Sequence, residues 1–299
     1  MMKLQGAFTA LITPMRDNGD VDFDGWIKLI DYQLENEIDG LVPIGTTGET
    51  PTLDESEEEK LIKMIVERVN GRVPVIVGAG SNSTHHAVSY TKRAKDLGAD
   101  AALVVTPYYN KPNDDGLLRH FEAVCKVGIP IMVYNIAGRT GRNIPTALME
   151  KIAKFDHIIG VKEASGDVSQ MSDVIEKIGR PSNGKFAVLS GDDGLTVPSM
   201  SMGGMGVISV ISNLLPSLVH KMTSYCLEGN FAEAANIHFA LSPFVKAAFI
   251  ETNPVPIKAA LQMANLPAGP TRLPLGKMSS QNEAFVKAAV ENLKKAKLL

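Results

Sequence analysis

The chain has 299 residues, a formal net charge of −3 at pH 7, 44% hydrophobic residues and 21% charged residues. These values are typical of an ordinary globular protein, whose length allows one large domain or two of average size. The slightly acidic balance lacks the clustered positive charge of nucleic-acid-binding proteins, and only two cysteines, Cys125 and Cys226, exclude a disulfide framework or a cysteine-based zinc site.

The sequence also argues against export, a membrane span and a metal site. It shows no long apolar signal region near the N-terminus and no run of about 18 or more apolar residues. His85 and His86 are neighbours on a predicted helix and point in different directions, while Asp192 and Asp193 have no histidine near them. We therefore predict a cytoplasmic protein without a membrane segment or a bound metal.

Short apolar runs alternate with amphipathic stretches along most of the chain. Eight runs are rich in Val, Ile, Leu and Ala without a polar alternation, which is typical of parallel strands buried on both faces. The predicted strands are residues 7–13, 40–44, 74–78, 101–106, 130–134, 158–162, 186–190 and 206–210. A helical segment follows each strand, so the pattern predicts an α/β protein with the closed (β/α)8 architecture of a TIM barrel.

Local signals mark several of the predicted helices. Thr52 and Glu55 predict a capping box after the second strand. A stripe of apolar residues from 117 to 125 places Cys125 on the core side of its helix. Pro198 falls where the helix after the seventh strand belongs, which predicts that this helix begins late or is kinked.

The pattern changes to helices alone after about residue 214. We predict a catalytic barrel domain over residues 1–225 and a C-terminal helical region, or appendix, over residues 226–299. Pro254 and Pro256 cannot both lie inside one regular helix, so the helical region is expected to be interrupted near them.

Chemically capable side chains follow the predicted strands, at the end of a barrel where catalysis takes place. Lys162 ends an apolar strand, where it either extends to water or lies desolvated as the free amine that Schiff-base chemistry requires. A structural alternative is a lysine paired with Glu163, although strand alternation points Glu163 to the opposite face. The residues alone leave the two interpretations open.

Two further features lie beside Lys162 in this arrangement. Tyr134 ends the neighbouring strand and can relay protons if a hydroxyl such as that of Thr46 shares them, or it can be an ordinary packed aromatic residue. The turn at residues 45–48 offers hydroxyls and N–H groups to a small carboxylate, or it is an ordinary turn between a strand and a helix.

Seven motifs in a fixed order cover essentially the whole chain: GTTGE (45–49), TPYYN (106–110), YN with RTG (134–141), IIGVKEASGD (158–167), LSGDD (189–193), GVISV (206–210) and NPVPIK (253–258). With them the chain resembles the dihydrodipicolinate synthase family of pyruvate-dependent class I aldolases. The resemblance implies that Lys162 forms a Schiff base with pyruvate and that the enamine attacks L-aspartate 4-semialdehyde. It implies no cofactor and a homotetramer built from tight dimers.

The resemblance also implies roles for individual residues. Thr46, Tyr134 and Tyr109 match a proton relay, in which Tyr109 comes from a neighbouring subunit. Further positions match contacts to the substrates, namely Thr47 for the pyruvate carboxylate, Gly191 and Ile208 for the site lining, and Arg139 for the carboxylate of the aldehyde. The family's proline is replaced by Ala137, so the loop that carries Arg139 is expected to be less rigid.

Some members of the family are inhibited by L-lysine, and five positions match that regulatory region: Thr50, Glu58, Asn82, His86 and Tyr108. His86 replaces a glutamate of lysine-sensitive members, which leaves the response to L-lysine open. The alternative functions are another aldolase on the same scaffold, such as N-acetylneuraminate lyase or a 2-oxo-3-deoxy sugar acid aldolase, and a non-catalytic binding barrel. Arg139 favours an acidic aldehyde, because a guanidinium binds a carboxylate through two hydrogen bonds.

Overall fold

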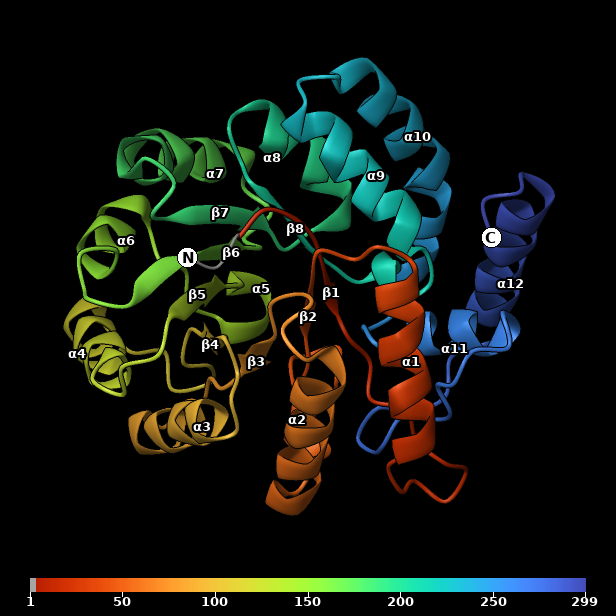
Figure 1. The fold of residues 1–299 in the computed structure, drawn as a ribbon, viewed down its shortest axis with the longest axis horizontal. Helices are drawn as coiled ribbons and strands as arrows, with labels where there is room; N and C mark the ends of the chain where they lie inside the picture. Colours follow the sequence, from red (N-terminus) through yellow and green to blue (C-terminus); the bar gives the residue numbers. More distant parts are fainter. Residues whose placement is uncertain (1–3) are drawn as a thin grey trace.

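The computed structural model describes residues 4–299 and contains a barrel of eight parallel strands (Figure 1). The strands are β1 (Gly6–Ala10), β2 (Gly40–Val42), β3 (Ile76–Gly78), β4 (Ala101–Val105), β5 (Ile131–Asn135), β6 (Ile158–Glu163), β7 (Ala187–Ser190) and β8 (Gly206–Ser209). Their order in the sheet is β2-β1-β8-β7-β6-β5-β4-β3. The barrel closes between β2 and β3, where the N–H of Leu41 donates to the carbonyl of Pro74 at 2.9 Å. The predicted TIM barrel is therefore confirmed.

Helices surround the barrel (Figure 1). Those of the β/α units are α1 (Phe23–Glu35), α2 (Glu55–Val69), α3 (Thr84–Asp96), α4 (Asp114–Cys125), α5 (Ala137–Thr140), α6 (Thr146–Ile152), α7 (Val168–Val174), α8 (Thr196–Ser201) and α9 (Pro216–Leu227). One-turn 3-10 segments are η1 (Thr50–Thr52), η3 (Arg180–Ser182), η4 (Asp193–Leu195) and η5 (Ile211–Asn213), and η2 (Ile175–Gly179) is a π-helical turn.

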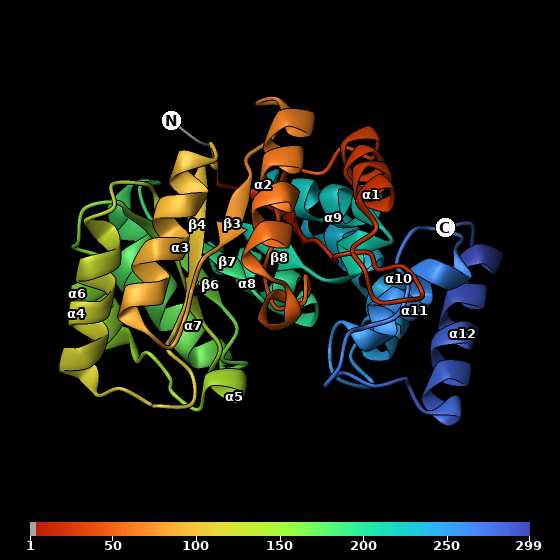
Figure 2. The ribbon, with the colours of Figure 1, turned by 90° about the horizontal axis from the view of Figure 1, so that it is seen from below.

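Three helices follow the barrel, α10 (Phe231–Ala248), α11 (Val255–Met263) and α12 (Ser280–Lys295). They lie together on the side of the barrel where α1 and α9 pack, and away from α3, α4 and α6 (Figure 2). The chain breaks between α10 and α11, with Pro254 before α11 and Pro256 in its first turn, as expected. Within residues 4–299 no helix is long and apolar enough to cross a membrane.

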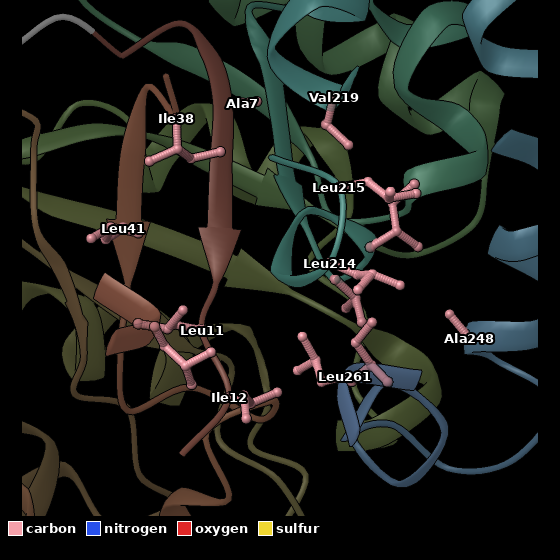
Figure 3. Close-up of a cluster of buried hydrophobic side chains, with 14 of the residues drawn as sticks. Ala7, Leu11, Ile12, Ile38, Leu41, Leu214, Leu215, Val219, Ala248 and Leu261 are labelled. Carbon is pink, nitrogen blue, oxygen red and sulfur yellow. The ribbon is translucent and has the colours of Figure 1, made fainter. Parts of the chain in front are cut away.

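The apolar core has an inner and an outer part. The barrel interior is filled by Phe8, Leu103, Met132, Leu189 and Ile208 among others, all buried. The larger outer cluster joins β1 and the first helices to the C-terminal helices, as seen in Figure 3 for Leu11, Ile12, Leu214, Ala248 and Leu261. The helices after residue 225 thus share a continuous core with the barrel, and the expected division at that residue stays a prediction.

Local structure corrects one of the sequence predictions and agrees with others. The capping box of α2 is formed by Asp54 and Glu57 and not by Thr52 and Glu55. The reason is that Thr52 ends the preceding 3-10 turn, where its hydroxyl donates to the carbonyl of Glu49 at 3.0 Å. Helix α8 begins late at Thr196, so Pro198 lies in its first turn, where helical N–H groups lack partners in any case. Both cysteines are buried and free, and Cys125 lies on the core side of its helix as predicted.

Candidate active site

Lys162 and Tyr134 lie side by side at the ends of neighbouring strands. The register of β5 on β6 pairs Tyr134 with Lys162, and each is 6% exposed. The Nζ atom of Lys162 lies 4.3 Å from the centroid of the Tyr134 ring. Among the described residues, no carboxylate lies within ion-pair distance of Lys162 Nζ. A buried amine beside a phenol is thus the central feature of this end of the barrel.

Glu163 points away from Lys162 and has partners of its own. Its carboxylate accepts hydrogen bonds from Asn135 Nδ2 at 3.1 and 3.2 Å, from the N–H of Ser165 at 2.8 Å and from Gln170 Nε2 at 3.2 Å. Because successive side chains of a strand point to opposite faces, Glu163 faces the helices while Lys162 faces the barrel axis. The structural alternative, a Lys162–Glu163 pair, is therefore not the one adopted.

A cavity of about 230 Å³ opens over Lys162 and Tyr134. Its lining includes three more of the predicted site residues, Thr46, Thr47 and Arg139. These five residues bring an amine, a phenol, two aliphatic hydroxyls and a guanidinium to the cavity from the ends of β2, β5 and β6. Among the residues 4–299, no group of three or more His, Cys, Asp or Glu side chains is arranged to hold a metal ion.

Gly191 and Ile208 border the same region from β7 and β8. A Cβ atom at Gly191 would lie 3.0 Å from Lys162 Cε and 2.6 Å from the Cβ of Ala164, so a glycine is required for the lysine side chain to pass. Ile208 is fully buried and belongs to the inner barrel cluster together with Tyr134. Neither residue is among those that line the cavity.

The turn after β2 is held in place by a buried ion pair that sequence reasoning missed. Lys258 of α11 donates to Glu49 Oε1 at 2.7 Å, and the two side chains are 2% and 1% exposed. The other carboxylate oxygen of Glu49 accepts the N–H of Arg272 at 2.9 Å. Since Glu49 ends the turn that carries Thr46 and Thr47, the C-terminal helical region anchors this turn.

Asn253 also connects the C-terminal region to the site. Its Nδ2 atom donates to Thr47 Oγ1 at 2.9 Å, and its backbone carbonyl accepts from Arg139 Nη2 at 3.3 Å. Arg139 lies on the four-residue helix α5, which begins at Ala137. Asn253 lies 206 residues from Thr47 and Lys258 lies 209 residues from Glu49, and the only sequence signal of either residue was the NPVPIK motif.

The two tyrosines of the TPYYN motif differ in their surroundings. Tyr108 lines the cavity, whereas Tyr109 is 89% exposed, has a φ of 74° and does not reach the cavity of its own chain. A positive φ is uncommon outside glycine, so the backbone at Tyr109 adopts a conformation that most side chains disfavour.

Three residues of the predicted regulatory set, Thr50, Glu58 and Tyr108, line the cavity as well. Burial raises the pKa of Glu58 to about 7, against the opposing effect of its ion-pair partner Arg93. The other two members lie outside the cavity lining: the exposed His86 stacks on Tyr90, and the carbonyl of Asn82 accepts from Asn110 at 2.8 Å. The structure therefore brings together only part of this set.

Comparison with known proteins gives one family. The model of the dihydrodipicolinate synthetase family matches residues 3–293. A protein of Protochlamydia amoebophila named 4-hydroxy-tetrahydrodipicolinate synthase is 52% identical over 97% of both chains. One of Methanocaldococcus jannaschii with the same name is 45% identical over 97% of this chain and 98% of its own.

Solved structures agree with these relatives. The 4-hydroxy-tetrahydrodipicolinate synthase of Methylacidiphilum fumariolicum superposes with a TM-score of 0.95 at 42% identity, covering 99% of this chain and 98% of that one. A structure described as the first monomeric dihydrodipicolinate synthase variant has a TM-score of 0.94 at 40% identity, with coverage of 99% and 98%.

Proposed function

The chain belongs to the dihydrodipicolinate synthetase family, and we propose that it condenses pyruvate with L-aspartate 4-semialdehyde to form 4-hydroxy-tetrahydrodipicolinate. This is a reaction of lysine and diaminopimelate biosynthesis. The observation that carries the proposal is the buried amine of Lys162, which lies beside Tyr134, has no carboxylate partner within residues 4–299 and lies under a cavity with hydroxyls and a guanidinium. Relatives named as this synthase favour it over the alternative aldolases of the same scaffold.

The reaction begins with the amine of Lys162. Its free base attacks C2 of pyruvate, and the carbonyl oxygen takes up a proton to give a carbinolamine. Loss of that oxygen as water requires a second proton, which Tyr134 can deliver from its place beside Lys162. Thr46 on the cavity wall is the hydroxyl with which Tyr134 would exchange this proton. Release of a proton from C3 of the imine then gives the enamine.

The enamine carbon attacks the aldehyde carbon of the second substrate, whose oxygen is protonated to a hydroxyl. The amino group of that substrate then attacks the imine carbon, closes a six-membered ring and displaces the amine of Lys162. Arg139 on the cavity wall would hold the carboxylate of the aldehyde, and Thr47 would hold that of pyruvate. The lysine is regenerated, so the cycle needs neither a metal nor an organic cofactor.

Assembly is part of this proposal, because Tyr109 does not reach the cavity of its own chain. We expect Tyr109 to complete the proton relay of a neighbouring subunit in a homotetramer built from dimers. Thr50, Glu58 and Tyr108, which match positions of the family's regulatory region, lie on the cavity wall, and inhibition assays with L-lysine decide whether this chain responds to it.

A direct assay distinguishes the candidates. Purified protein is given pyruvate with L-aspartate 4-semialdehyde in one reaction and pyruvate with N-acetylmannosamine in another. We expect turnover only in the first. Turnover only in the second would assign the chain to the lyases, and turnover in neither would favour a non-catalytic barrel.

A further inference from the structure

Asn253 contacts both of the residues that the proposed function assigns to substrate carboxylates. The side chain donates to the hydroxyl of Thr47 and the backbone carbonyl accepts from the guanidinium of Arg139. Asn253 itself is 5% exposed and does not line the cavity, so it acts on substrates only through these neighbours.

The direction of the hydrogen bond to Thr47 has a chemical consequence. A hydroxyl has one proton to donate, and it can accept hydrogen bonds on its lone pairs. Because Thr47 Oγ1 accepts from the amide of Asn253, the Thr47 proton stays available to a second acceptor. Thr47 is 3% exposed, and among residues 4–299 its hydroxyl donates to no protein group. The acceptor that the cavity offers this proton is a bound anion.

A second observation separates Asn253 from an ordinary structural asparagine. Its Oδ1 atom is buried and has no hydrogen-bond partner among the described residues. Buried polar atoms are nearly always paired, and leaving one unpaired is destabilising. Of the two polar atoms of this amide, only Nδ2 is therefore hydrogen-bonded within the described chain, and its partner is Thr47.

The segment that carries Asn253 is itself anchored. Five residues later, Lys258 is bonded to Glu49, at the other end of the turn that holds Thr47. The segment 253–258 thus holds the carboxylate-binding turn at two points, which fixes the amide relative to the hydroxyl. The contact to Arg139 adds a restraint on helix α5, where Ala137 replaces a proline expected from the family resemblance.

We propose that Asn253 is a positioning residue that commits the Thr47 proton to the carboxylate of the 2-oxo acid substrate. This inference rests on the proposed function, since it needs a 2-oxo acid bound at Lys162. It predicts a specific pattern: loss of the amide weakens binding of pyruvate and leaves the later chemical steps nearly unchanged.

The test measures the concentration of pyruvate that half-saturates borohydride trapping in Asn253→Ala, Thr47→Val and the double variant. We expect each single variant to raise this concentration roughly three- to tenfold, the effect of one lost hydrogen bond. The double variant should be no worse than Thr47→Val alone, because the amide acts through the hydroxyl. In Asn253→Ala, the turnover number at saturating pyruvate should change less than twofold.

Asn282→Ala is the matched control. Asn282 donates its side-chain amide to Glu251 at 2.7 Å, so the variant removes an equivalent bond close to Asn253 without touching Thr47 or Arg139. Its trapping curve should match that of the unmodified protein.

Asn253→Asp tests the same idea in a side chain of the same shape. The carboxylate introduced at this position would accept the hydrogen bond that Thr47 otherwise donates to the substrate, and its negative charge would repel the substrate carboxylate. This variant should therefore bind pyruvate more weakly than Asn253→Ala. If Asn253 had a purely structural role, Asn253→Asp would bind pyruvate better than Asn253→Ala, because Asp keeps the shape of the side chain. The expected result would exclude that role. If the unmodified protein traps no pyruvate, the proposed function and this inference both fail. If the unmodified protein does trap pyruvate, two results would contradict this inference alone. One is that both Asn253 variants need the same pyruvate concentration for half-saturation as the unmodified protein. The other is that the effect of Asn253→Ala adds to that of Thr47→Val.

Discussion

Replacing Lys258 by methionine should strongly destabilise the fold, because it leaves a buried carboxylate without its counter-ion. All three ammonium hydrogens of Lys258 are used, by Glu49 Oε1 at 2.7 Å, the carbonyl of Pro270 at 2.6 Å and the carbonyl of Thr13 at 3.1 Å. Burial lowers the pKa of Lys258, so the intact pair contributes little net stability. Removing one partner of such a pair nevertheless costs about 3–5 kcal/mol.

This cost can be converted into a melting temperature. For a chain of 299 residues, an unfolding entropy of about 2.1 cal/mol/K per residue gives a decrease of roughly 5–8 °C. Lys295→Met is the control, because Lys295 is exposed on α12 and its replacement should change stability by no more than about 0.5 kcal/mol. Because Glu49 ends the turn with Thr47, Lys258→Met should also raise the pyruvate concentration needed for half-saturation.

Urea titration of Lys258→Met, Glu49→Met, the double variant and the control measures these effects. The losses of stability in the two single variants should not add, because the double variant removes both charges together. The double variant should lose less than the sum of the single losses by at least about 1 kcal/mol. A loss below about 1 kcal/mol for Lys258→Met, or strict additivity in the double variant, would refute the reasoning from the buried pair.

Three other results are expected. Arg139→Ala should raise the KM for aspartate semialdehyde about ten- to a hundredfold, from the loss of roughly 1.5–3 kcal/mol, while pyruvate trapping survives; normal KM values for both substrates would contradict the role of Arg139. Mixed Lys162→Ala and Tyr109→Phe subunits should regain activity if Tyr109 serves a neighbour, and an inactive mixture with verified subunit exchange would rule this out. Burial raises the pKa of Asp193 to about 6, so folding stability should fall as pH rises from about 4 to about 6, because the folded carboxyl holds its proton longer than the unfolded one. In Asp193→Asn this decrease of the free energy of unfolding with pH should disappear. Urea titrations at several pH values measure it, and an equal decrease in both proteins would contradict the role of Asp193.

Much of the barrel could be predicted because its signals are local. Each strand is a continuous apolar run, and strand ends in a parallel barrel meet at one rim, so the sequence alone predicts that Lys162 lies beside Tyr134. Strand ends were less predictable. The first strand was expected to reach residue 13 but β1 ends at Ala10, since the N–H of Ile12 bonds to the side chain of Asn213. An apolar residue gives the same sequence signal in a buried strand and in the buried loop that follows it.

The supports of the site could not be predicted from local patterns. The bonds from Asn253 to Thr47 and from Lys258 to Glu49 join residues more than 200 positions apart, and neither has a periodicity that identifies its partner. From the sequence alone, Lys258 in the first turns of its helix would be predicted to be exposed, and only the folded structure shows that it is buried. Similarly, Thr52 with Glu55 and Asp54 with Glu57 look alike as capping signals, and only the preceding turn decides between them.

The most direct test of the account is the identity of the lysine that reacts with pyruvate. The protein is incubated with pyruvate, reduced with borohydride and digested, and the adduct is located by mass spectrometry. The buried amine beside Tyr134 predicts one reduced pyruvate adduct per chain, on the peptide that contains Lys162, and none in Lys162→Ala. An adduct on Lys258 or any other lysine, or no adduct on the unmodified protein, would contradict it.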